Sequence, residues 1–193
     1  MGINVHHKKI SSVILPSCAL LVSGIALAGE PSFTFYEISG DSAGTLRKQL
    51  DEKRPQDGSG DRFDGITDNS ISYTYEYAPT TNGCKFSEFS PVLETTITMP
   101  RWVDADLTSE LGKKWQSFYQ ALLEHELGHR DIGLSLYKEL EAAGRNFETA
   151  KNCDSIGDEF ERVATSLFEK YKEMDRQYDL QTDHGRKHGA AFL

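Results

Sequence analysis

A stripe of apolar side chains between residues 111 and 140 restricts the fold of this chain more than any other feature of its sequence. The apolar residues recur at alternating steps of three and four, as one face of a single α-helix requires. They are Leu111, Trp115, Phe118, Leu122, Ile132, Leu136 and Leu140. The interval between Leu122 and Ile132 is filled, on the same steps, by His125 and His129. The pattern therefore predicts one long helix whose buried face carries two histidines.

These histidines belong to the segment HELGH, in which Glu126 follows the first of them. Two imidazoles four residues apart on a helix point the same way, so both can bind one ion at about 2 Å. Glu126 is turned to the side of that ion, where it can accept a proton from water that the ion activates. Buried imidazoles also destabilise a fold unless their nitrogens are bonded, and a metal satisfies both. The spacing favours a hydrolytic zinc site over a helix with ordinary polar residues.

A zinc site of this kind needs a third protein ligand, and the adjacent residues do not supply one. In the metzincin pattern a glycine and a third histidine would stand at Ile132 and Ser135, so that class is excluded. Carboxylates at the start of the next helix and histidines in the C-terminal tail remain, although the helix dipole alone also favours an acidic first turn. These candidates are Asp158, Glu159, Glu161, His184 and His188.

The rest of the chain predicts an α+β fold. Residues 70–77 and 93–99 alternate between apolar and polar side chains, and a turn sequence lies between them, so the first half predicts a small antiparallel sheet. A second helix is expected from Ser155, because apolar residues recur at helical spacing after it. An exposed strand beside the long helix would hold an extended substrate by β-augmentation, and residues 93–99 are the candidate.

The first 28 residues predict a secretory signal peptide. A short cationic start precedes an apolar stretch that ends in Ala26-Leu27-Ala28, the small-residue spacing of a cleavage site. An uncleaved membrane anchor is the alternative, because the apolar stretch is almost long enough to span a bilayer. The sequence thus predicts an exported protein, periplasmic or secreted, with a single domain over residues 29–193. No other apolar stretch follows, so no membrane association is expected after cleavage.

The net charge limits the possible binding partners, and the cysteine content predicts a disulfide. The net charge of −9 argues against nucleic acid or an anionic membrane as a partner. Only Cys84 and Cys153 lie beyond residue 28, and in an oxidising compartment they are expected to form a disulfide. The sequence does not indicate an oligomeric state.

The HELGH segment and the tail YDLQTDHGRKHGAAF together resemble a bacterial family of secreted zinc-dependent proteases described as domain of unknown function 922. The similarity extends to residues 36–50, residues 60–67, the PRW segment before the long helix and both cysteines. The resemblance implies a zincin-like peptidase with His125 and His129 as zinc ligands. It favours His184 as the third ligand, because His188 stands where the family usually has glutamine.

On this interpretation, one zinc ion is bound by His125, His129 and His184, with water as the fourth ligand and Glu126 as general base. Asp179 or Asp183 would accept the free N–H of a ligating imidazole. Tyr178 would donate a hydrogen bond to a developing oxyanion, or would simply be the last apolar contact of the second helix.

The expected reaction is hydrolysis of a peptide bond in a peptide or protein substrate. Two alternatives remain open at this point. One is a zinc hydrolase that acts on cell-wall peptides. The other is a non-catalytic envelope protein with a structural zinc, for which a closed site with four protein ligands would be typical.

Overall fold

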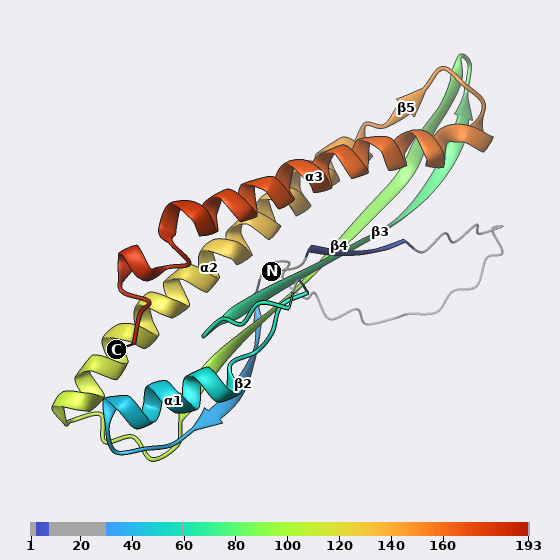
Figure 1. Ribbon diagram of the computed structural model, residues 1–193. Coiled ribbons are helices and arrows are strands. Elements are labelled where there is room, and N and C mark those ends of the chain that lie inside the picture. Colours follow the sequence, from blue (N-terminus) through green and yellow to red (C-terminus); the bar gives the residue numbers. More distant parts are fainter. Residues whose placement is uncertain (1–2, 8–29, 59, 193) are drawn as a thin grey trace, which may run out of the picture.

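The computed structural model describes residues 3–7, 30–58 and 60–192, and it confirms the α+β fold (Figure 1). The strands are β1 (Ile3–His7), β2 (Ser32–Ile38), β3 (Ile66–Thr80), β4 (Gly83–Trp102) and β5 (Glu148–Thr149). The α-helices are α1 (Ala43–Lys53), α2 (Glu110–Arg145) and α3 (Ile156–Thr182). Two short 3-10 helices, η1 (Cys153–Ser155) and η2 (Arg186–His188), precede and follow α3.

The expected signal peptide lies almost entirely outside the described residues. Of its 28 residues only 3–7 are described, as β1, so its apolar stretch and cleavage site are not part of the structure. Within the described part of the chain, no helix has the length and apolar character needed to cross a membrane.

The sheet is mixed, whereas the sequence predicted an antiparallel one. Its strands lie in the order β1-β3-β4-β2, with β5 paired to β4. The long β3–β4 hairpin is antiparallel as expected, but β2 pairs with β4 in parallel and β1 pairs with β3 in parallel. Parallel neighbours need a long crossover connection. The chain provides it here because α1 and the whole of β3 lie between β2 and β4.

The prediction that residues 93–99 form an exposed strand for substrate is wrong for the central part of that segment. These residues lie inside β4, where residues 96–98 pair with β2 on one side and with β3 on the other. The backbone groups of residues 96–98 are therefore already committed to the sheet, and no peptide can add to it there, whereas residues 93–95 pair only with β3 among the described strands. Strand alternation alone does not distinguish a central strand from an edge strand.

The long helix predicted by the apolar stripe is confirmed as α2. The side chain of Ser109 accepts a hydrogen bond from the backbone N–H of Gly112 and so caps its start. In Figure 1, α2 and α3 run side by side along the β3–β4 hairpin, and α2 contacts both of these strands.

Two apolar clusters form the core, one at each end of α2. The first includes Leu46 and Leu50 of α1 with Trp115 and Phe118 of α2. The second gathers side chains of the hairpin, the second half of α2 and the start of α3, among them Phe160. The HELGH segment lies between these clusters, where the apolar stripe of α2 is interrupted.

The predicted disulfide is confirmed. Cys84 at the start of β4 is bonded to Cys153 at the start of η1, across a sequence separation of 69 residues. It ties the end of the hairpin to the beginning of α3, far along the fold from the HELGH segment.

Removing this disulfide should lower the thermal stability without changing the HELGH segment. Loss of a native bridge of this kind typically costs about 2–5 kcal/mol, which corresponds to a fall in Tm of roughly 4–20 °C for a domain of this size. The measurement is calorimetry of the parent and of a Cys84→Ala/Cys153→Ala double variant. An equal Tm for both proteins would show that the bridge is not a stability element.

Candidate metal centre

Three ligand atoms converge at the middle of α2. Nε2 of His125 lies 3.2 Å from Nε2 of His129, and Oδ1 of Asp179 lies 3.2 Å from the first and 3.1 Å from the second. Ligands about 2 Å from a tetrahedral zinc ion are separated from one another by about 3.3 Å. The three atoms therefore have the spacing of one face of a tetrahedral zinc site.

Asp179 occupies the position that the sequence interpretation gave to His184. Among the described residues, the side chains that could share one ion are His125, His129 and Asp179. His184 approaches this group only through Asp179, with its Nδ1 at 3.3 Å from the Oδ1 of that residue. Its side chain is 44% exposed, against 3% for His125 and 1% for His129. The geometry thus favours a carboxylate of α3 as the third ligand.

The position of His184 follows from how α3 ends. Asp183 and His184 both adopt positive φ angles of 52° and 49°, so the chain reverses directly after the helix. This turn places the His184 ring beside Phe63, with ring centroids 5.0 Å apart. Asp183 itself is exposed at the reversal and His188 is exposed in η2.

The acidic candidates at the start of α3 are remote from the HELGH segment. Glu159 accepts a hydrogen bond from Thr149 and pairs with Lys151, and Glu161 accepts one from Tyr73. Asp158 lies in the same first turn. Twenty residues of helix separate Glu159 from Asp179, or about 30 Å. The carboxylate ligand therefore comes from the predicted helix but from its opposite end.

Asp175 forms a hydrogen bond with the imidazole of His129 on the side away from the other ligands. Its Oδ1 lies 2.6 Å from Nδ1 of His129, the nitrogen that faces away from Asp179, and Asp175 is only 9% exposed. This is the orienting role that the sequence interpretation gave to Asp179 or Asp183. Asp175 and Asp179 are four residues apart on one face of α3, as His125 and His129 are on α2. That matched spacing was readable from the sequence and was overlooked.

Replacing Asp175 with asparagine should weaken metal binding by about 10–100-fold, as is typical when the partner of a ligating imidazole is lost. Asparagine keeps the size of the side chain and an acceptor for the His129 N–H, but removes the charge that makes the imidazole a stronger ligand. Competition with a chromophoric chelator measures the affinity. Asp158→Asn, the same change at an exposed position of α3, should leave it unaltered. An Asp175→Asn protein with the parent affinity would contradict this role.

The electrostatics of the site favour positive charge. Burial opposes a charged His129, but hydrogen bonds to Asp175 and Asp179 outweigh it and raise the pKa of His129 to about 9. Burial likewise opposes a charged Asp179, yet hydrogen bonds with His125 and His129 hold the pKa of that carboxyl well below its usual range. A divalent cation would supply the same positive charge and release the imidazole proton. The residues present thus fit a bound divalent metal ion.

Glu126 is buried beside the three ligand atoms and is 1% exposed. The Thr67 hydroxyl lies 2.8 Å from its Oε2, to which it donates, and 3.0 Å from its backbone carbonyl oxygen. Burial raises the pKa of Glu126 to about 7, against the lowering effect of His129 and Thr67. A methyl group at Gly65 would come within 2.8 Å of Oε1, so glycine there leaves room for the carboxylate. A carboxylate with a pKa near neutrality is suited to accept and return a proton.

Polar side chains on the core-facing side of β3 fix this part of α2. Asn69 donates to the backbone carbonyl of His129 at 3.0 Å, and Thr95 donates to Asn69 at 2.7 Å. Thr67 and Asn69 share a face of β3 with the buried Ile71, where apolar side chains are the rule. Sequence reasoning missed both residues, although polar residues at core-facing strand positions were the available signal.

Tyr178 packs against both imidazoles. Its ring is stacked on His125, with centroids 5.1 Å apart, and meets His129 edge to face at 4.9 Å. Its hydroxyl lies over Gly128, where a side chain on residue 128 would collide with it. These contacts support a role in holding the imidazoles in place, and Tyr178 does not line the cavity described next. The oxyanion role stays a prediction.

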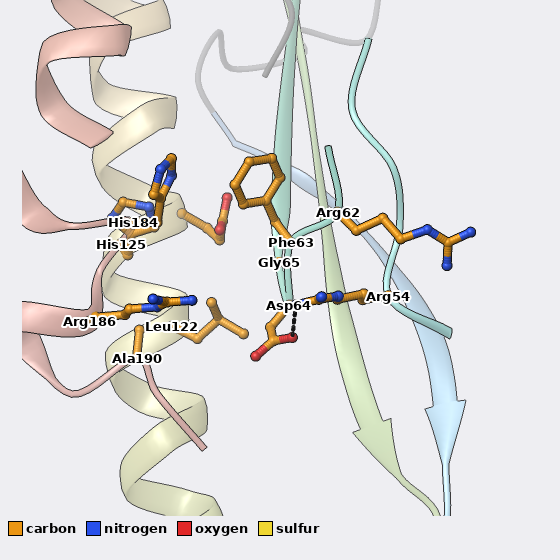
Figure 2. Close-up of a pocket in the computed structure, with 11 residues that line it drawn as sticks. Arg54, Arg62, Phe63, Asp64, Gly65, Leu122, His125, His184, Arg186 and Ala190 are labelled. Carbon is orange, nitrogen blue, oxygen red and sulfur yellow. Dashed lines mark ion pairs between the residues drawn. The ribbon is translucent and has the colours of Figure 1, made fainter. Parts of the chain in front are cut away.

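A cavity of about 100 Å³ opens beside the metal centre (Figure 2). His125 and Glu126 form part of its wall, and the segment before β3 and the C-terminal tail complete it. The lining residues are Arg54, Arg62, Phe63, Asp64, Gly65, Leu122, His125, Glu126, His184, Arg186 and Ala190. The carboxylate of Glu126 and a ligand imidazole thus face a space that a small group can enter.

Comparison with known proteins finds one family. Residues 33–185 match the family described as "Bacterial protein of unknown function (DUF922)". Neither the curated proteins nor the solved structures contain a match. The matched region covers most of the chain and includes the HELGH segment, Asp175, Asp179 and His184. The chain therefore belongs to this bacterial family, as the resemblance of its HELGH and tail segments implied.

Proposed function

We propose that this protein is an exported zinc-dependent metallopeptidase, with zinc bound by His125, His129 and Asp179 and with Glu126 as the general base. The observation that carries the proposal is the triangle of ligand atoms, 3.1–3.2 Å apart, beside a buried carboxylate that faces a cavity. Three protein ligands leave a fourth tetrahedral position open, as in catalytic zinc sites. Export rests on the signal peptide expected over residues 1–28.

The chain's own groups can perform the proton transfers of peptide hydrolysis. A bound zinc ion acts as a Lewis acid and makes water a stronger nucleophile near neutral pH. Glu126 accepts the proton that water loses as its oxygen attacks the peptide carbon, and then gives this proton to the leaving nitrogen. Thr67 keeps the carboxylate oriented by donating to Oε2. Tyr178 and Asp175 hold the ligand imidazoles in position.

A structural zinc is the main competing function. A structural site is closed by four protein ligands, whereas the group found among the described residues has three, with a cavity beside it. The buried Glu126 also favours catalysis, because a structural site needs no second carboxylate next to its ligands. Hydrolysis of cell-wall peptides uses the same chemistry. Only the substrate that the protein cleaves therefore distinguishes a cell-wall hydrolase from a peptidase that acts on proteins.

Metal analysis and cleavage assays on the purified protein test the proposal together. We expect about one zinc per chain, cleavage of an unstructured protein, loss of cleavage with a chelator and recovery when zinc is returned. Products from cell-wall peptides alone would assign the alternative substrate. A folded, fully metallated protein that cleaves neither substrate would leave the structural zinc as the better explanation.

A further inference from the structure

Arg186 is a cation on the wall of the cavity, and no partner for its side chain lies in the described part of the protein. Its side chain lines the cavity together with Glu126 and His125. Among the described residues, its guanidinium makes no ion pair and no hydrogen bond. In Figure 2 the guanidinium of Arg186 points from the tail across the cavity, whereas that of Arg62 points away from it. Arg186 therefore presents unused donors to the space beside the metal centre.

The backbone of the tail fixes Arg186 in this place. Gly185 has a φ of +77° and packs so closely on His125 that a methyl group there would come within 2.9 Å of the imidazole. The N–H of Arg186 donates to Asp183, and those of His188 and Ala190 both donate to Gly185. Further on, Phe192 is buried against Trp115 and Phe118. The turn that carries Arg186 is thus anchored on a ligand side chain at one end and in the core at the other.

Arg54 adds a second, incompletely used guanidinium to the cavity wall. Its Nε is buried and has no hydrogen-bond partner in residues 3–7, 30–58 and 60–192. Its Nη1 forms ion pairs with Asp51 at 3.6 Å and with Asp64 at 3.8 Å, both too long for a strong hydrogen bond. Asp64 neutralises Arg54 only in part, because both of its oxygens accept hydrogen bonds of 2.7 Å from Arg47 and its ion pair with Arg54 is longer, at 3.8 Å. The cavity wall thus carries the guanidinium groups of three arginines, Arg54, Arg62 and Arg186, against the carboxylates of Asp64 and Glu126.

We propose that Arg186, assisted by Arg54, binds a carboxylate of the substrate, so that the bond cleaved lies next to that carboxylate. This specificity rests on the function proposed above. Guanidinium groups bind carboxylates through paired charge-assisted hydrogen bonds. A cavity of about 100 Å³ has room for about three water molecules, which is the size of a carboxylate with its nearest atoms. The carboxylate is either the C-terminus of a peptide or the side chain of an acidic residue.

Binding to the zinc-loaded Glu126→Gln protein tests the inference without turnover. The probes are short peptides that differ only in a C-terminal carboxylate against a C-terminal amide, and a second pair that differs in aspartate against asparagine. Calorimetry should give at least tenfold tighter binding for the carboxylate member of one pair or of both. The pair that shows the preference identifies the source of the carboxylate.

Variants assign the preference to Arg186. Arg186→Gln should abolish most of it, and Arg54→Gln should reduce it. The matched control is Lys187→Gln, which removes the same charge from the neighbouring exposed position, where the ammonium donates to the Gln181 carbonyl oxygen. Equal affinity for both members of each pair, or equal loss in the Lys187→Gln control, would overturn the inference. Cleavage of peptides without any carboxylate preference would also overturn it while leaving the proposed function intact.

Discussion

Replacing Glu126 with glutamine is expected to remove nearly all turnover while the fold and the zinc remain. An amide cannot accept the proton from the attacking water, and loss of a general base commonly costs about 10²–10⁴-fold in rate. Stability should not suffer, because the amide fits the same buried space beside Gly65 and its oxygen can still accept from Thr67. Zinc content, circular dichroism and kcat on the same preparation measure all three properties.

The neighbouring Glu124 provides the matched control for this substitution. It lies exposed on the same helix, next to the ligand candidate His125, and its carboxylate accepts a hydrogen bond from Gln120. Glu124→Gln should therefore keep the parent kcat. If Glu126→Gln cleaves as fast as the parent, the catalytic mechanism proposed here is wrong.

The features that the sequence predicted well are those that a single element determines. The three- and four-residue steps of the apolar stripe define one face of α2, so they place His125 and His129 on that face wherever the helix packs. The pairing of Cys84 with Cys153 was equally constrained, because no other partner exists beyond residue 28. Neither prediction depends on how two elements are arranged in space.

The third ligand depends on such an arrangement. Periodicity says that α3 packs on α2, but not which turn of α3 faces His125 and His129. The structure places the last turns there, which brings in Asp175 and Asp179, and the reversal at Asp183 then directs His184 to Phe63. A charged residue near the end of a helix looks like a solvated one unless its partner is known.

The pairing of strands in the sheet also depends on an arrangement in space that the sequence pattern does not reveal. Alternation along residues 93–99 predicts a strand with one buried face, and Leu93, Ile97 and Met99 are indeed buried. The alternation does not show which strands pair with β4 on its two sides, and these are β2 and β3. The parallel pairing of β2 arises from the path of the chain through α1, which no local pattern records.

Removal of the Asp179 carboxylate should damage the metal centre as severely as the loss of a ligand histidine. Asp179→Ala deletes one of the three ligand atoms, so zinc affinity should fall by more than the 10–100-fold typical of a lost orienting group, and activity should fall with it. His184→Ala should change zinc affinity by less than about tenfold, because that ring is exposed and contacts the ligand group only through Asp179. Chelator competition measures each affinity, and circular dichroism checks each fold.

Asp183→Ala is the control, since it removes the same carboxylate from an exposed position four residues further on and should leave zinc affinity unchanged. The comparison of Asp179→Ala with His184→Ala separates two different centres. If the His184 variant loses zinc and the Asp179 variant retains it, the third ligand is an imidazole and Asp179 serves to orient it, since its Oδ1 lies 3.3 Å from Nδ1 of that ring. If both variants lose zinc, His184 completes a site with four protein ligands. Such a site has no open position for water, so that result would favour a structural zinc over a peptidase.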